Sequence, residues 1–363
     1  HGISRGHPLV LELINRGASA TAFHETLENY VTVEIFSKLS AEQKRVLSVL
    51  SIFREPVSID ALTDQQLNID VLGSLVEQGL ARQVDSEVYD VHDLIREFLL
   101  RSLDEKLKIE LHNKCSSWYQ RSSDASLFTI ELIFHLVSSK NMVEAASIIV
   151  DKGRSLIAQG HLELLSLIDS LEISEISSDA STKINHYKGE ILALLGRFEE
   201  AKTAFVMAQE LASKGKDVNT QAELLSALAD ISLKQGNLDE SLSMHLEALE
   251  IFVKLKDAIG AARSYNNMGY ILRRKNDKSK ALESYAEVEA ILQENDDEEL
   301  IASQLILARS LMDLGEIERA RDHALAAFDK TDKLNDKQLH ARAQGVLGRY
   351  YAKVGDSDVA SHH

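Results

Sequence analysis

The stretch Gly196-Arg-Phe-Glu-Glu-Ala201 returns four times along the second half of the chain in related form. The later copies read Gly236-Asn-Leu-Asp-Glu-Ser241, Asn276-Asp-Lys-Ser-Lys-Ala281, Gly315-Glu-Ile-Glu-Arg-Ala320 and Gly355-Asp-Ser-Asp-Val-Ala360. Their first residues are 40, 40, 39 and 40 positions apart. A regular period of this length is typical of solenoids, in which each repeat buries its apolar face only against its neighbours. The second half is therefore predicted to be a stacked array that presents a binding surface.

Each copy is predicted to join two helices. In the third copy, apolar residues recur every three or four positions before the turn, up to Leu272, and after it, at Ala281, Tyr285 and Val288. This spacing is the helical period. The residue that opens each phrase is Gly or Asn, the types that tolerate a left-handed conformation at a helix end.

Small residues occupy one position in the first helix of every copy and another at the start of the second. A large side chain at either position would overpack the pair, at a cost of about 1–3 kcal/mol, so the paired helices are predicted to approach closely. The first-helix residues are Gly189, Ala229, Gly269, Ala308 and Gly348, and the second-helix residues are Ala201, Ser241, Ala281, Ala320 and Ala360.

Residues 181–363 resemble the tetratricopeptide repeat (TPR), which combines these small residues with a bulky one four positions later, here Phe205 and Tyr285. The usual unit has about 34 residues, so the longer period implies longer helices, similar to those of regulators of the maltose-regulon-activator type. A non-repeating helical bundle is the alternative. The fifth copy reaches Ala360, one turn into its second helix, so we expect a truncated last repeat and a fragment of a longer protein.

Composition narrows the classes of function. The formal net charge is −17, which disfavours nucleic acid as a partner because phosphate contacts supply most of that affinity. No stretch of the sequence approaches 18 uncharged apolar residues, so a membrane partner is not expected. The single cysteine, Cys115, is predicted to be a buried small hydrophobe, and a cytoplasmic location is expected.

The sequence offers no candidate catalytic residues and no candidate metal ligands. The phosphate-loop pattern Gly-x-x-x-x-Gly-Lys-Ser/Thr does not occur. The sequence therefore lacks the loop amides and the lysine that would bind a triphosphate and Mg²⁺. No set of Cys and His residues has metal-binding spacing. The chain is predicted not to be an enzyme and to hold no cofactor, with ATP or ADP a ligand only of a longer parent protein.

Residues 28–104 predict a different fold. An amphipathic helical pattern at 41–53 is followed by short helical patterns at 59–64 and 69–79 and by two strands, 80–84 and 88–91. Three helices followed by a hairpin is the order of a winged helix.

DNA binding is the commonest use of the winged helix and is a competing interpretation. Residues 29–103 hold 7 basic against 12 acidic residues, and the third helix has no Arg or Lys between Asn68 and Gly79. A recognition helix without a cation argues against DNA.

Two short motifs flank this region. Arg5-Gly6-His7-Pro8 resembles the Gly-x-Pro segment near the end of the ATPase core in STAND-class signalling NTPases, and Val91-His92-Asp93 resembles their Met-His-Asp motif, with Val in place of Met. The resemblance implies that residues 1–27 end an NTPase helical region and that an NTPase domain lies upstream. It also implies that Pro8 lies along the nucleotide and that His92 reaches toward the β-phosphate of ADP. Alternatively, Asp93 is simply the N-cap of the helix at 94–103 and His92 is an ordinary turn residue.

Residues 105–180 are predicted to form irregular helix pairs between these two parts. The Ser- and Asp-rich stretch Ile173–Thr182 is predicted to be a loop or boundary. His135 lies on an apolar helical face, which favours a core residue over a ligand.

In TPR arrays the first helix of each pair lines the concave surface. Counting back from the turn residues predicts which side chains of each first helix lie on this surface. These side chains are acidic and polar in the second copy and mainly arginines in the later copies. Clustered arginines suit bidentate capture of carboxylates or phosphates, so the predicted partner is a protein or peptide, or a small anionic inducer; arginines that merely face solvent are the alternative. The second copy contributes Glu223, Ser226 and Asp230; the predicted ligand-groove residues are Arg263, Asn266, Tyr270, Arg273, Arg309 and Arg349, with Arg342 on the same wall.

The sequence thus favours a mainly α chain, a winged helix followed by a TPR-like solenoid. The leading hypothesis is a non-catalytic sensor arm of a STAND-type NTPase, whose repeats bind a signal while the winged helix controls the nucleotide switch. The alternatives are a free-standing TPR scaffold and a winged-helix DNA-binding regulator.

Overall fold

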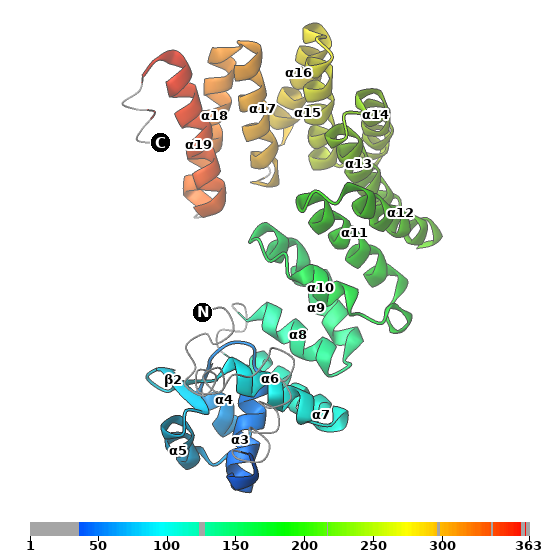
Figure 1. The fold of residues 1–363 in the computed structure, drawn as a ribbon. Helices are drawn as coiled ribbons and strands as arrows, with labels where there is room; N and C mark the ends of the chain where they lie inside the picture. Colours follow the sequence, from blue (N-terminus) through cyan, green and yellow to red (C-terminus); the bar gives the residue numbers. More distant parts are fainter. Residues whose placement is uncertain are drawn as a thin grey trace, which may run out of the picture. The chain divides into compact units, whose positions relative to one another are not determined.

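A computed structural model of the chain describes residues 36–122, 128–215, 217–295, 298–334, 337–356 and 360 (Figure 1). The chain divides into two compact units, His1–Glu175 and Ile176–His363. Pro8 and the rest of the predicted NTPase segment at 1–27 lie outside the described residues.

The described part of the first unit opens with short helices and a small antiparallel sheet. β3 lies in the middle of the sheet, with strand order β1-β3-β2. Val57 is opposite Tyr89 on one side of β3, and Ala81 is opposite Val91 on the other. The elements are η2 (Phe36–Lys38), α3 (Ala41–Ile52), β1 (Val57–Ser58), α4 (Ile59–Asp64), η3 (Ile69–Val71), α5 (Leu72–Glu77), β2 (Ala81–Asp85), β3 (Val88–Val91) and α6 (Asp93–Ser102).

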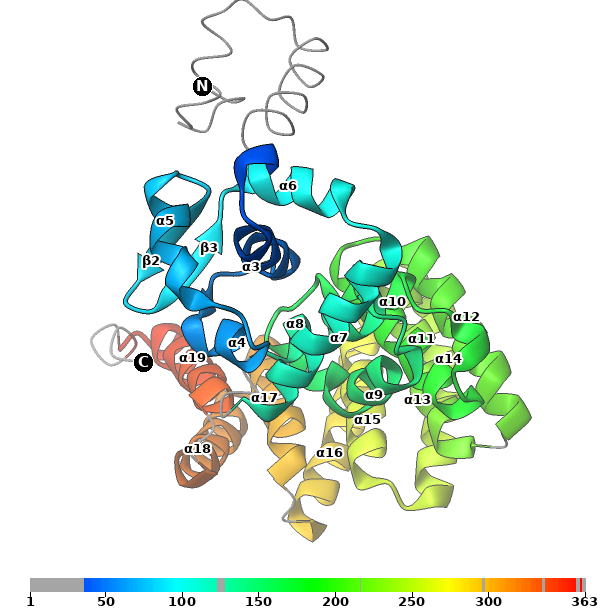
Figure 2. The ribbon, with the colours of Figure 1, turned by 90° about the horizontal axis from the view of Figure 1, so that it is seen from below.

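Helix α3 organises this part of the fold. It begins at a capping box in which Ser40 and Gln43 satisfy each other's backbone amides. Its apolar face, including Val46, Leu47 and Leu50, is buried. β2, β3 and α5 lie beside α3 (Figure 2), and both β3 and α5 contact it.

The predicted order of helices and hairpin is present, with three differences. The helix predicted at 69–79 is a 3₁₀ turn followed by α5, which stops at Glu77 before Gly79, whose φ is +69°. The strand β1 was not predicted because it has only two residues and directly follows Pro56, which leaves no alternating pattern to detect. Asp93 is the first residue of α6, and the N-cap position is His92, so the N-cap alternative is wrong.

Helices α7 (Glu105–Arg121), α8 (Thr129–Ser138), α9 (Met142–Ala158) and α10 (Leu164–Asp169) follow, and η4 (Ile173–Glu175) ends the described part of the first unit. Of the two predictions for Ile173–Thr182, the boundary is confirmed, because the two units divide between Glu175 and Ile176. The loop is wrong for most of the stretch, because η4 and the first turn of the next helix occupy it. Ser177 is the N-cap of that helix and accepts a hydrogen bond from the amide of Ala180. Serine and aspartate are favoured at the start of a helix as well as in loops, and in this stretch they indicate a helix start.

The core of the first unit contains two histidines in contact. The Nδ1 atoms of His112 on α7 and His135 on α8 lie 2.9 Å apart. His135 is 0% exposed and packs against the rings of Phe53 and Tyr119, which confirms it as a core residue. Cys115 is also fully buried, as predicted, and burial raises the pKa of its thiol to about 12.

The second unit consists of helices arranged as pairs, with the first helix of a fifth pair at the end (Figure 1). Each pair packs antiparallel around one repeat of the sequence phrase. The helices are α11 (Ser178–Leu194), α12 (Phe198–Gly215), α13 (Val218–Lys234), α14 (Leu238–Leu255), α15 (Ala258–Arg274), α16 (Lys278–Glu294), α17 (Ile301–Leu314), α18 (Ile317–Leu334) and α19 (Lys337–Val354), with η5 (Glu298–Leu300) before α17.

The residue that opens every phrase adopts the left-handed conformation, as predicted. Its φ is +75° at Gly196, +88° at Gly236, +62° at Asn276, +87° at Gly315 and +89° at Gly355. One turn geometry thus recurs in all five copies, which keeps successive pairs in register.

The small residues bring the paired helices into close contact, as predicted. A Cβ atom built on Gly189 would lie 2.4 Å from the ring of Phe205, and one on Gly269 would lie 2.5 Å from the ring of Tyr285. In the second copy, Ser241 is fully buried and donates a hydrogen bond to the carbonyl of Ala229, 2.7 Å away. Helix pairs this close could not form with larger residues at these positions.

The first helices of the pairs line the inner side of the array. Among the described residues, successive first helices (α11, α13, α15, α17 and α19) pack directly against one another, whereas successive second helices do so much less. In a curved stack, helices on the inner side lie closer to one another than helices on the outer side do. The first helices therefore form the concave wall.

Candidate ligand groove

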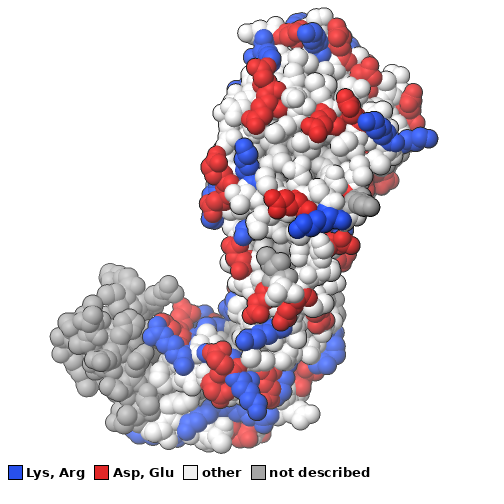
Figure 3. Space-filling view, turned by 90° about the vertical axis from the view of Figure 1, so that its right-hand side faces the viewer, with Lys and Arg blue, Asp and Glu red and all other residues white. Residues whose placement is uncertain are grey.

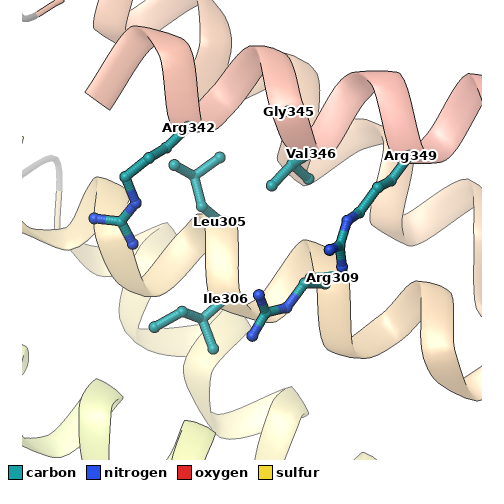
Figure 4. Close-up of a pocket in the computed structure, with 7 residues that line it drawn as sticks. All are labelled: Leu305, Ile306, Arg309, Arg342, Gly345, Val346 and Arg349. Atoms are coloured by element: carbon teal, nitrogen blue, oxygen red, sulfur yellow. The ribbon is translucent and has the colours of Figure 1, made fainter. Parts of the chain in front are cut away.

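A shallow pocket of about 210 Å³ lies between α17 and α19 on this wall (Figure 4). Three arginines surround it, Arg309 from α17 and Arg342 and Arg349 from α19. The pocket is also lined by Leu305, Ile306, Gly345 and Val346.

Helical spacing explains why these residues meet. Arg342, Val346 and Arg349 follow one another at four and three positions along α19, and Leu305 and Arg309 are four apart on α17. Residues three and four apart lie on one face of a helix. Because α17 and α19 are first helices of adjacent repeats, these two faces look into the same groove.

The charge of the pocket comes from its three arginines. Within the part of the chain that the structure describes, none of their guanidinium groups has an ion-pair or hydrogen-bond partner. Many other charges of the array are paired, as between Arg319 and Glu289 at 2.7 Å and between Arg197 and Glu200 at 2.5 Å. Figure 3 shows the same interspersed acidic and basic side chains on one face of the molecule. The unpaired trio is therefore a local concentration of positive charge in an acidic protein.

The other predicted groove residues do not join this pocket. Asn266 is 1% exposed, and its side-chain amide donates to the carbonyl of Ser303 at 3.1 Å, so its predicted place on the surface is wrong. Arg273 lies 3.4 Å from the carboxylate of Asp313, with its guanidinium 5.2 Å from the centre of the Tyr270 ring. Arg263 is half-buried on α15. Asn266 and Arg273 are thus engaged by the next repeat, whereas Arg263 has no ion-pair or hydrogen-bond partner among the described residues but does not line the pocket.

The predicted polar residues of the second copy are also mainly structural. Ser226 is buried. Asp230 accepts a hydrogen bond from the side-chain amide of Asn267 at 2.9 Å and lies 3.3 Å from the ring of His245. Glu223 is half-buried. The structure therefore brings three unpaired arginines together between α17 and α19: Arg309 and Arg349 from the predicted ligand-groove residues, and Arg342, which was predicted on the same wall but not among those residues. Its position seven residues before Arg349 was the signal that could have included it.

A larger pocket, of about 510 Å³, lies in the first unit between α3, α4 and α7. Its lining holds both signs of charge, and these form pairs: Arg121 with Asp64 and Lys114 with Glu110, each at 2.7 Å. Paired charges provide less attraction for an ionic ligand, so the smaller arginine pocket is the better candidate.

His92 sits at the start of α6 and is half-buried, and burial lowers the pKa of its imidazole. Beside it in sequence, Asp90 is 3% exposed and binds both Arg82 and Arg96. The described residues thus place His92 next to a buried carboxylate that fixes two arginines, while its predicted partner in nucleotide contact, Pro8, is not described.

Two classes of site find no support in the described residues. No group of three or more His, Cys, Asp or Glu side chains among them could hold a metal ion. None of the helices described for this chain has the length and apolar character needed to cross a bilayer.

Sequence profiles of the tetratricopeptide repeat match residues 220–294 and residues 301–326. These segments are tetratricopeptide repeats. The matches cover nearly all of α13, then α14 to α16, all of α17 and the first half of α18, so they include one of the two helices that line the arginine pocket. A comparison with curated protein sequences finds no match.

Solved structures share the fold. One is a signal transduction ATPase with numerous domains (STAND) protein with a tetratricopeptide repeat sensor from Pyrococcus horikoshii, with 21% identity and a TM-score of 0.56 over 99% of this chain and 54% of that one. The present chain thus spans about half the length of that protein. A Rap conjugation gene regulator of the plasmid pLS20, solved with the Phr* peptide, has 14% identity and a TM-score of 0.53, covering 88% of this chain and 83% of that one.

A Rap protein complexed with competence and sporulation factor gives 13% identity and a TM-score of 0.51, covering 73% of this chain and 82% of that one. At these identities the likeness concerns the fold alone. It establishes a mainly helical TPR solenoid, the architecture predicted for residues 181–363.

Proposed function

We propose that this chain is a ligand-sensing arm whose TPR array binds an anionic peptide or protein segment on the concave face of α17 and α19. The observation that carries the proposal is the trio of unpaired arginines around the pocket. A guanidinium without a local counter-ion is pre-organised for a carboxylate, which it binds through charge-assisted and often bidentate hydrogen bonds. In this proposal the chain recognises a ligand and does not catalyse a reaction.

The first unit then relays the signal. We propose that residues 36–104 form a winged helix and that they control the nucleotide state of an NTPase domain to which the arm belongs. The order of elements, the His92-Asp93 pair and the shared fold with a STAND protein that has a TPR sensor support this part. Such a switch responds only if the ligand binds one state of the protein better than the other.

A binding measurement tests the sensing proposal. The probe is a fluorescein-labelled oligoglutamate peptide, titrated with the whole chain at low salt and followed by fluorescence anisotropy. The net charge of −17 repels this probe, so binding has to come from a local site. We expect the double variant Arg309→Gln/Arg349→Gln to bind at least about ten-fold more weakly, because each lost charged hydrogen bond is worth about 1.5–3 kcal/mol.

The matched control is Arg274→Gln, which removes an exposed arginine from the last turn of α15, outside the pocket. It should bind the peptide as the unaltered chain does, and both variants should keep the same helical circular dichroism. The double variant removes two charges and the control removes one, so a loss of binding free energy in the control of half that of the double variant or more would show that only net charge matters and would refute the proposed site.

A further inference from the structure

The pocket has two positively charged ends separated by an apolar strip. In Figure 4 the guanidinium groups of Arg309 and Arg349 lie close together at one end, and Arg342 stands at the other. The side chains of Leu305, Ile306 and Val346 lie between them. A single small anion would use only one end, so the layout fits a longer ligand.

The distance between the two ends follows from the helix. Arg342 and Arg349 are seven residues apart on α19, which is two turns or about 10 Å along the axis at about 1.5 Å per residue. A polyproline II segment rises about 3.1 Å per residue with three residues per turn, so positions i and i+3 lie on one side, about 9 Å apart. An extended peptide can therefore bring two carboxylates to the two ends of the pocket at once.

Gly345 leaves room for the backbone of such a peptide. Its equivalents in earlier repeats carry side chains (Ser226, Asn266 and Leu305), whereas a Cβ atom built on Gly345 would have nothing within 4 Å. Gly345 is exposed and lines the pocket. The wall is therefore open at the midpoint between the two charged ends.

We infer that this site recognises an extended peptide segment with two acidic side chains three residues apart and apolar side chains between them. The acidic side chains pair with Arg342 and with the Arg309–Arg349 pair, and the apolar ones cover Leu305, Ile306 and Val346. This inference rests on the proposed function and adds to it the spacing that the site selects.

Two peptides of identical composition test the spacing. The first contains Asp-Val-Leu-Asp and the second Val-Asp-Asp-Leu, each flanked by Gly-Ser and Ser-Gly, blocked at both termini and labelled with fluorescein. Because only the first reaches both charged ends, we expect the whole chain to bind it at least about ten-fold more tightly. The variant Arg342→Gln should abolish this preference and leave the weaker peptide almost unaffected.

A second variant tests whether the open position at Gly345 is needed for peptide binding, without changing the charge of the site. Gly345→Leu keeps all three arginines and places a side chain in the open position, where an exposed helical site accepts leucine readily. We expect it to weaken binding of the Asp-Val-Leu-Asp peptide at least about ten-fold with unchanged thermal stability or a small gain. Equal affinity of the two peptides, or a preference that survives Arg342→Gln, would overturn the inference while leaving the proposed anion site in place. Binding of neither peptide, nor of oligoglutamate, would overturn both.

Discussion

Replacing Gly269 with alanine is expected to lower the free energy of unfolding of the TPR array by about 1–3 kcal/mol, the usual cost of overpacking a core. The added methyl group would lie 2.5 Å from the ring of Tyr285, which is itself 0% exposed and has no space into which to move. The two helices of the third pair, α15 and α16, would have to separate. Urea unfolding followed by circular dichroism measures the loss.

Gly345→Ala is the matched control for this prediction. Gly345 also lies inside a first helix, α19, but its Cβ position is empty. Alanine there removes only conformational freedom from the unfolded chain, so we expect a gain of about 0.5–1 kcal/mol. The double variant Gly269→Ala/Tyr285→Leu should lose less than the sum of its parts, since a smaller partner relieves the overlap. Similar effects of the two alanine substitutions would contradict the close helix contact at Gly269.

The stability of the first unit is expected to fall by about 3 kcal/mol or more between about pH 7 and pH 4, because of the buried histidines. Burial lowers the pKa of His112 to about 4 and the pKa of His135 well below its ordinary value. In the unfolded chain both imidazoles titrate near pH 6.5. Between those pH values the unfolded state binds more protons than the folded state, so stability is complete above about pH 6.5 and is lost as the pH falls toward 4.

Tryptophan fluorescence isolates this effect, because Trp118 is the single tryptophan of the chain and lies on α7, one turn and a half beyond His112. Urea unfolding at several pH values should show a steeper pH dependence for the unaltered chain than for His112→Gln, which keeps a hydrogen-bonding side chain but does not titrate. The exposed His161, with 40% of its side chain accessible, provides the control: His161→Gln should leave the pH dependence unchanged. If all three proteins show one pH profile, the buried pair does not govern stability.

The helix pairs of the array could be predicted from the sequence because the residues that determine them lie close together in the chain and recur in every copy. The left-handed turns at Gly196, Gly236 and Asn276 and the small residues opposite Phe205 and Tyr285 each follow from a residue type at a fixed place in the period. Because the same pattern occurs in five copies, each copy supports the interpretation of the others. The helix pairs and the close contacts within them were therefore predicted correctly.

The site was only partly predictable, because side-chain pairing depends on neighbours distant in sequence. Counting positions put Asn266 and Arg273 on the concave wall, but Asn266 binds the carbonyl of Ser303 in the next repeat and Arg273 lies against Asp313. Nothing in the third copy alone reveals that these partners exist. Which arginines remain unpaired among the described residues, such as Arg309, Arg342 and Arg349, is therefore a property of the stack. The contact between His112 and His135, 23 residues apart, was missed for the same reason.

Hydrogen–deuterium exchange of the whole chain with and without the Asp-Val-Leu-Asp peptide tests the central claim most directly, since it locates the ligand without any substitution. Peptide bound in the groove should slow exchange in α17 and α19, the two helices that carry the arginines, and leave α18 and the first unit unchanged. Slower exchange confined to α18 or to residues 36–175, with α17 and α19 unaffected, would contradict the account.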